Sequence, residues 1–308
     1  CILDYNIKQA SRDIAVAAIT GFYGSLKSYR SDKSKSKFKN EPKLPRYKKS
    51  FELMPLIINH TRLVKRGCKE NEIKLPKSHF KFKTRIPKYL IRCVRIVSVH
   101  HKVKIEVIYD NNKDIKFNLD KSIIAGLDIG VNNLASLTFN KIHKSYLING
   151  RPLKSINQFF NKEKSKIQSE LKITNDREWS NRLANLQLKR NNKINDYMHK
   201  SSKLIIDLLL ENNVGKIVIG KNKDWKTSSK MSKKNNQNFI SIPHAKFIDM
   251  IKYKCENVGI EVILTEESYT SKVDHLSNEK LGKHKKYNGK RVNRGLFKSF
   301  SGKLLNAD

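Results

Sequence analysis

The sequence predicts an α/β protein in which a mixed sheet follows a smaller region of helix and short strands. Short apolar runs bounded by turn residues recur along the chain, as expected for buried strands. A long charged segment, residues 155–213, carries apolar positions at helical spacing toward its end. After residue 121 apolar runs and helical segments alternate, which favours a sheet covered by helices.

We expect a helical, basic region over residues 1–60, a β-rich region over 61–120 and the mixed-sheet domain over 121–308. Within the first region, residues 3–29 carry apolar positions at helical spacing and predict one or two amphipathic helices. Residues 31–50 form a lysine-rich loop in which two prolines prevent regular helix.

Three residues of this loop, Lys43, Arg46 and Tyr47, suit a nucleic-acid backbone with one stacked base. A solvated surface loop explains each of them at least as well.

In the second region, residues 94–99 and 103–109 flank His100-His101-Lys102 and predict a hairpin. No acid or cysteine lies near the two histidines, so a metal site there is disfavoured.

The third region is expected to contain its elements in a definite order. Strands are predicted at 123–131, 134–140 and 145–148, helix within 155–213, a strand at 216–220, a helix after Pro243 with Gly259 as its C-cap, and a strand at 260–265. Three strands, helix, strand, helix, strand is the element order of the RNase H fold.

Charge points to a polyanionic partner. The chain has 308 residues with 64 Lys and Arg against 28 Asp and Glu, a net charge of +36. Nucleic acid is the natural partner, because phosphate contacts release counterions. The charge runs along the whole chain, which favours an extended nucleic-acid path over a tethering arm. The 38% hydrophobic content is enough for packed cores, and the length suggests about two domains.

Cysteine spacing and hydropathy indicate the compartment. Cys1, Cys68, Cys93 and Cys255 are far apart and form no CxxC pair, so no zinc site is expected. No apolar run reaches ~18 residues and no signal peptide is evident, so we expect no membrane partner and a cytoplasmic protein with free thiols. The chain starts at a cysteine and stops inside an apparent motif, which suggests a fragment truncated at both ends.

The most informative segment is 123–139, which places Asp128 in the middle of an apolar strand before the polar turn Asn132-Asn133. Desolvating an unpaired carboxylate is costly, so we expect Asp128 to be buried with a partner, a metal cation being the leading choice. The alternative is a strand-end aspartate that forms a local Asx-turn, and this segment alone favours neither. The hairpin is typical of the start of an RNase H-like nuclease.

Five segments in order resemble the TnpB family, which insertion sequences encode and which is often described as transposases. They are Gly126–Leu137, Lys216–Trp225, Asn235–His244, Thr265–Lys272 and Leu305–Asp308. TnpB proteins are RNA-guided DNA nucleases related to the type V CRISPR effectors. The resemblance implies a RuvC-like, RNase H-like catalytic domain, preceded by a smaller helical recognition and β-barrel wedge region.

Two catalytic acids carry over directly: Asp128 matches the first RuvC carboxylate, and Asp308 matches the third, in an Asn-Ala-Asp motif that opens the last helix of the family. The second acid departs, because the family usually has glutamate at the end of the fourth strand, where this chain has Gly220. Glu267 is the favoured substitute, since the fifth strand lies beside the fourth, ~4.8 Å away. Asp224 is a weaker choice.

Strand alternation should turn Glu266 the other way from Glu267. A site that has lost its glutamate and no longer cuts is the remaining possibility for this position.

The resemblance implies a metal-dependent DNA endonuclease that uses guide RNA and both double- and single-stranded DNA. Asp128, Glu267 and Asp308 would bind two Mg²⁺ or Mn²⁺ ions ~3.5–4 Å apart, with metal-bound water as nucleophile. The alternative function is a catalytically dead, RNA-guided DNA-binding repressor. A generic basic RNA-binding protein is disfavoured by a buried Asp128.

Two further stretches can be compared with the TnpB family. One departs from its pattern, and the other has residues suited to binding nucleic acid. Residues 272–304 lack the family's frequent zinc ribbon and form either a phosphate-binding loop, with Lys272, Arg291 and Arg294, or a basic linker. Lys226 and Asn236 suit contacts to guide RNA or heteroduplex, and the neighbouring Trp225 either stacks there or packs under its loop.

The histidines His199 and His244 are expected to be helix-surface or capping residues rather than metal ligands.

Overall fold

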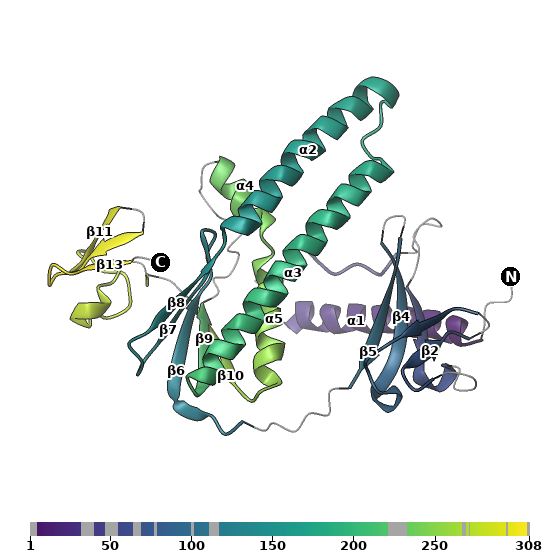
Figure 1. The fold of residues 1–308 in the computed structure, drawn as a ribbon, viewed down its shortest axis with the longest axis horizontal. Coiled ribbons are helices and arrows are strands. Elements are labelled where there is room, and N and C mark those ends of the chain that lie inside the picture. The colour runs from purple at the N-terminus through teal and green to yellow at the C-terminus, as the bar shows by residue number, and fades with distance from the viewer. Residues whose placement is uncertain are drawn as a thin grey trace. The chain divides into compact units, whose positions relative to one another are not determined.

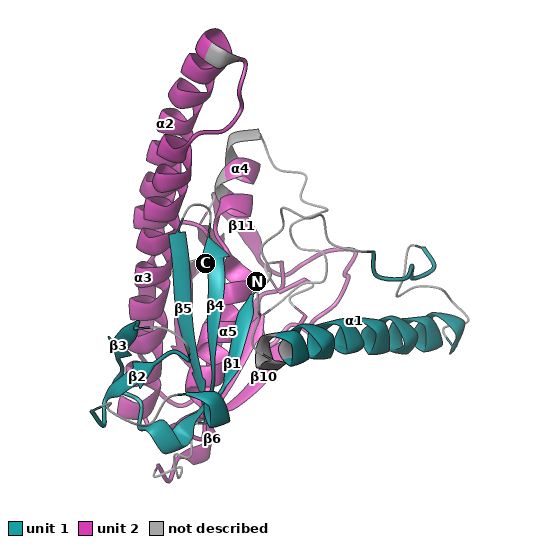
Figure 2. Ribbon diagram, turned by 90° about the vertical axis from the view of Figure 1, so that its right-hand side faces the viewer, with its two compact units in different colours: residues 1–113 teal, residues 114–308 magenta. Residues whose placement is uncertain are grey.

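The chain is described by a computed structural model. It describes residues 5–31, 40–46, 55–63, 69–76, 79–99, 102–110, 117–220, 233–266, 269–270, 272–293 and 295–306. The residues group into two compact units, 1–113 and 114–308, which are coloured separately in Figure 2. None of the described helices combines the length and apolarity needed to cross a bilayer.

The first unit consists of one long helix and small antiparallel sheets. The helix α1, Tyr5–Ser31, is a single element where the sequence left one or two open. Strands β1, β4 and β5 form one sheet in the order β1-β4-β5, and β2 pairs with β3. Their bounds are Leu56–Asn59 for β1, Glu72–Lys74 for β2, Lys81–Lys83 for β3, Ile91–Val99 for β4 and Lys102–Tyr109 for β5. The predicted hairpin is β4 with β5.

Two short 3-10 turns, His60–Arg62 and Lys88–Leu90, connect these strands. The small core contains Ile58, Ile73 and Val94, all nearly or completely buried.

A five-stranded mixed sheet lies at the centre of the second unit (Figure 1). Its strands are β6 Asp120–Asp128, β7 Asn133–Phe139, β8 Ser145–Asn149, β9 Val214–Gly220 and β10 Glu261–Thr265. The order across the sheet is β10-β9-β6-β7-β8. The first three strands in sequence pair antiparallel, whereas β6 with β9 and β9 with β10 are parallel. The predicted mixed α/β class is therefore confirmed.

Helices pack against this sheet through an apolar core. They are α2 Arg151–Asn175, α3 Asn181–Glu211 and α5 His244–Glu256, while α4 Lys233–Ser241 contacts α2. The core includes Leu134, Ile205, Leu209, Ile217 and Phe247, each with no exposed surface. Along α3 the spacing of Ile205 and Leu209 by four residues puts both on the face that meets the sheet.

The predicted charged helical region is two helices, α2 and α3, which lie side by side in Figure 1. The break occurs where Asp176 adopts a positive φ of 48° and ends α2. Ser180 then caps α3, because its side chain accepts a hydrogen bond from Leu183 N–H at 3.2 Å. After α5, Gly259 has a φ of 81°, as its predicted capping role requires.

The C-terminal segment is a small sheet rather than a basic linker. The 3-10 turn His275–Ser277 is followed by β11 Lys290–Asn293, β12 Leu296–Lys298 and β13 Leu304–Asn306, in the order β11-β12-β13. Asn306, the first residue of the Asn-Ala-Asp motif, ends a strand, and the rest of the motif lies outside the described residues.

Candidate functional site

Three neighbouring strands of the mixed sheet, β6, β9 and β10, end at one edge. They run parallel, so their carboxyl ends meet there. Leu127 pairs with Ile219, and Gly220 pairs with Thr265. The last residues of the three strands therefore form one row across the sheet. Strands are ~4.8 Å apart, which puts the backbones at Asp128 and Thr265 about 10 Å from each other.

Asp128 is the last residue of β6, and its side chain is exposed. The expectation that it is buried is wrong. Its neighbours Leu127 and Ile129 are 3% and 2% exposed, because strand alternation turns both of them into the core and Asp128 to the opposite side. An exposed carboxylate keeps its hydration, so burial no longer argues for a metal ligand over a turn-forming residue, or against a generic RNA-binding protein.

The turn that follows Asp128 is held by three contacts from two helices, α2 and α5. The N–H of Gly150, at the start of α2, donates to Asn132 O at 2.7 Å. Lys154 Nζ donates to Asn132 Oδ1 at 2.9 Å. From α5, His244 Nε2 lies 3.2 Å from the carbonyl oxygen of Gly130, so the ring donates from that nitrogen. The main chain beside Asp128 is thus fixed from both α2 and α5.

His244 is a residue whose role the sequence missed. It is 1% exposed, so the expectation of a helix-surface or capping histidine is wrong for it. Its ring packs against Phe239, with centroids 5.1 Å apart. The available signal was Pro243, which fixes the start of α5 and so places the next side chain on its first turn. His199, by contrast, is exposed on α3 as expected.

The other predicted acids cannot be placed. Glu267 and Asp308 lie outside the described residues, as do Asp224 and Trp225. Glu266 is described, follows β10 directly and is exposed. The described residues alone contain no group of three or more His, Cys, Asp or Glu side chains able to hold a metal, and this set excludes two of the three predicted ligands.

The predicted nucleic-acid residues lie on separate elements. Lys43 and Arg46 are exposed in the described stretch 40–46 of the first unit. In the second unit, Asn236 is half-buried on α4, Lys272 is exposed before the C-terminal sheet, and Arg291 is exposed on β11. The remaining three, Tyr47, Lys226 and Arg294, and the histidine pair 100–101, lie outside the described residues.

A buried carboxylate, Asp274, organises the C-terminal segment and was not foreseen from the sequence. It has no exposed surface. One carboxylate oxygen accepts from Ser299 Oγ at 2.7 Å and from Phe300 N–H at 2.8 Å, and the other from Leu276 N–H at 3.1 Å. Its own N–H donates to Glu279 Oε2 at 2.8 Å. This Asp274 hub joins the turn at 274–279 to the start of the 299–303 loop.

Burial by itself would raise the pKa of Asp274. The hydrogen bonds from Phe300, Ser299 and Leu276 outweigh it, so the pKa is held below its ordinary value of 3.8. The carboxylate is therefore ionised at neutral pH inside the segment.

Two family models match parts of the chain. Residues 100–226 match the OrfB_IS605 family, described as a probable transposase. Residues 244–308 match the TNB domain of Cas12f1-like proteins. The comparison with curated proteins gave no match.

Two solved structures are similar over part of their length. The Cas12f1–sgRNA–target DNA complex is 18% identical, with a TM-score of 0.49, over 64% of this chain and 40% of that one. The CRISPR-Cas12f ternary complex is 18% identical, with a TM-score of 0.41, over 59% of this chain and 36% of that one. The chain thus spans well under half of either protein. The two family matches confirm the resemblance drawn from the sequence: one part of the chain is similar to a transposase family and another to a domain of the Cas12f1-like proteins.

Proposed function

We propose that this chain is part of an RNA-guided, metal-dependent DNA endonuclease with an RNase H-like, RuvC-like catalytic domain. The observation that carries the proposal is the edge of the mixed sheet. Strands β6, β7 and β8 are antiparallel neighbours, and β9 and β10 extend the sheet in parallel beyond β6. An exposed aspartate, Asp128, stands at the end of the first strand, where the edge is shared with β9 and β10.

The residues at this edge suit a hard divalent cation. Asp128 offers carboxylate oxygens that a cation can reach without burying them. Glu267 comes two residues after β10, and Asp308 two residues after β13. These three acids would hold Mg²⁺ or Mn²⁺, which when bound supplies an activated water and stabilises the leaving oxygen. The contacts of Gly150, Lys154 and His244 to the turn keep the Asp128 backbone in place.

Charge supports nucleic-acid partners for the same chain. A net charge of +36 favours binding along phosphate backbones. The Cas12f1 structure named above contains an sgRNA and target DNA. From the resemblance drawn from the sequence and the two family matches, we assign this protein a guide RNA and a DNA target, both double-stranded and single-stranded. We place it in the prokaryotic cytoplasm, where thiols such as those of Cys93 and Cys255 stay reduced.

A second function, RNA-guided DNA binding without cleavage, is favoured by one specific residue. Gly220 ends β9 at the position where the family has its second acid. If no other acid replaces it, the protein binds its target as a repressor does.

Cleavage assays on the natural full-length protein with its copurified RNA separate the two functions. Sequencing that RNA defines the guide and therefore the DNA target. We expect cutting with Mg²⁺ or Mn²⁺ and none with EDTA. Asp128→Asn and Glu267→Gln should each reduce cutting by about 100-fold or more, with target binding unchanged.

The matched controls are the neighbouring acids. Glu266→Gln and Asp224→Asn change the same charge and should keep cutting near the wild-type rate. If Glu267→Gln cuts normally and Asp224→Asn does not, Asp224 is the second ligand. Tight target binding by the wild type without product under either metal establishes the repressor function.

A further inference from the structure

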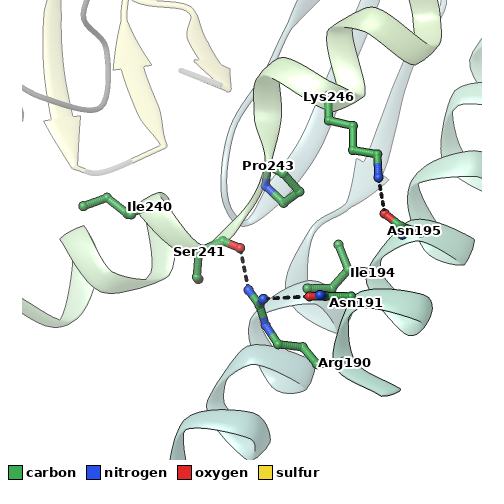
Figure 3. A pocket seen from close by; sticks show the side chains of 8 residues that line it. All are labelled: Arg190, Asn191, Ile194, Asn195, Ile240, Ser241, Pro243 and Lys246. Atoms are coloured by element: carbon green, nitrogen blue, oxygen red, sulfur yellow. Dashed lines mark hydrogen bonds between the residues drawn. The ribbon is translucent and has the colours of Figure 1, made fainter. Parts of the chain in front are cut away.

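A pocket of about 440 Å³ lies between α3 and the connection from α4 to α5 (Figure 3). It is separate from the strand edge that carries Asp128. The residues that line it include Arg190, Asn191, Asn195, Ile240, Pro243 and Lys246.

The cation on one side, Arg190, is held by uncharged oxygens. Its Nε donates to Asn157 Oδ1 at 2.7 Å, one terminal nitrogen to Asn191 Oδ1 at 3.1 Å and the other to Ser241 O at 3.0 Å. Its guanidinium also lies 5.1 Å from the centre of the Phe160 ring. A guanidinium has five N–H donors, so these contacts orient the group and leave donors for a ligand.

Among the described residues, no acid balances the charge of Arg190. Burial lowers the pKa of Arg190, with no contribution from a carboxylate, yet arginine stays protonated at neutral pH. Lys246 reaches the same pocket and donates to Asn195 Oδ1 at 2.7 Å. Neither cation takes part in an ion pair with any acid in the described ranges, and no acidic residue among those described lines the pocket. A half-buried cation without a counter-charge favours an anionic ligand.

The α4–α5 side of the pocket carries two apolar residues, Ile240 and Pro243, together with Ser241 and Lys246. Ile240 is 49% exposed although it is a large aliphatic residue, and Pro243 also lines the pocket. Figure 3 shows Ile240 and Pro243 on the α4–α5 side and Arg190 on the α3 side. Cations next to an apolar surface match a nucleotide, which joins a phosphate to a flat base. The volume is within the usual 300–1,000 Å³ of small-ligand sites, at roughly the size that one nucleotide needs.

An adjoining pocket of about 260 Å³ extends the surface between α2 and α3 and shares Arg190. It is lined by Phe159, which is 60% exposed, and by the exposed Lys189 and Lys193. An exposed aromatic ring in a pocket that lysines also line suits a stacked base with phosphate contacts nearby.

We propose that the Arg190–Lys246 pocket binds one unpaired nucleotide of a nucleic-acid strand. Its phosphate lies on Arg190 and Lys246, its base lies against Ile240 and Pro243, and the adjacent nucleotide stacks on Phe159. Bases of a duplex are stacked inside the helix and cannot enter such a pocket, so the ligand is single-stranded. The inference rests on the proposed nucleic-acid function and assigns a subsite to it.

Fluorescence anisotropy without metal tests the pocket independently of cleavage. The probes are labelled single-stranded RNA and DNA 12-mers and a duplex of the same sequence, each titrated with the full chain over a range of salt concentrations. Ile240→Ala changes no charge. It should weaken single-strand binding about fivefold or more and leave duplex binding and the salt dependence unchanged. Arg190 is left intact, because its contacts also hold α2 and the Ser241 carbonyl.

Lys246→Gln should weaken single-strand binding about tenfold and reduce the salt slope by about one. The matched control is Lys252→Gln, which removes the same charge from the same helix outside the pocket. The difference between RNA and DNA affinities tells which strand occupies the site.

Three results would overturn the proposal. One is equal weakening of single strands and duplex by Ile240→Ala. Another is an equal effect of Lys246→Gln and Lys252→Gln, which would mean general attraction to a polyanion. The third is binding of inorganic phosphate to the wild type, but not to Lys246→Gln, at least as tightly as the single strand, which would make this a free-phosphate site. Failure of the nuclease assay leaves these readings unaffected, because they need neither metal nor cutting.

Discussion

Replacing Gly150 by alanine should destabilise the mixed-sheet unit measurably. A Cβ built at this position would lie 2.2 Å from Val131 O and 3.0 Å from Leu134 N. Ordinary contact begins near 3.4 Å, so main-chain atoms of the turn after Asp128 would have to move by more than 1 Å. No flexible side chain is available to give way.

The expected magnitude follows from two opposing terms. Gly150 has φ −96° and ψ −9°, which alanine adopts freely. The more restricted unfolded chain would therefore contribute about 0.4–1 kcal/mol in favour of the alanine variant. Overpacking costs about 1–3 kcal/mol, and contact with main chain favours the upper end. The net loss is about 2 kcal/mol, or about 4–8 °C in Tm for a unit of this size.

Thermal unfolding followed by circular dichroism measures this loss. The matched control is Gly126→Ala in β6 of the same sheet, where the nearest atom to a new Cβ is Thr138 Oγ1 at 3.3 Å, on a side chain that can rotate. That variant should stay within about 1 kcal/mol of the wild type. The reasoning is refuted if Gly150→Ala melts within about 1 °C of the wild type, or if both variants lose the same stability.

Three further outcomes are expected. Because the folded pKa of Asp274 is below 3.8, its carboxylate stabilises the C-terminal sheet above that pH and the contribution is lost as the pH falls through the folded value. Hydrogen exchange should show the amides that donate to it losing protection in acid, and an Asp274→Asn variant lacking protection even at neutral pH. Burial raises the pKa of the Cys255 thiol to about 12, so its stabilising effect is present below pH 9 and lost between pH 9 and 12. At pH 8 iodoacetamide should leave Cys255 unmodified while Cys93 reacts, as peptide mass spectrometry can follow. Adding Gly220→Glu to Glu267→Gln should raise cleavage about tenfold over the single variant, and no gain would mean that β9 does not face the metals.

Local periodicity explains which elements could be predicted. The β4–β5 hairpin, the strands of the mixed sheet and α5 all follow from local runs of apolar residues. Contacts with residues far away in the sequence do not change these elements. The break at Asp176 was missed because no Gly or Pro marks it, and a single aspartate in the left-handed region ends the helix instead. The strands of the C-terminal sheet have only three or four residues, too few for a pattern.

The site was predicted less well, for a related reason. Asp128 was expected to be buried because apolar residues surround it, yet in a strand the residues on either side face away from it. Leu127 and Ile129 are core residues, and their burial is what exposes Asp128. The Asp274 hub and the Arg190 contacts join residues 25 and 51 positions apart, and no local pattern encodes such pairs.

The Asp274 hub also fixes when the segment 274–303 can fold during synthesis. The carboxylate accepts hydrogen bonds from Ser299 and Phe300, which follow it by 25 and 26 residues. Until both residues have been added, one oxygen of Asp274 lacks these donors. Burying the carboxylate would then cost more free energy than packing of the segment contributes. A growing chain therefore leaves residues 274–298 open even after β11 and β12 have been made. They close together once the 299–303 loop has left the ribosome, so a chain that stops before Ser299 exposes the whole segment to proteases.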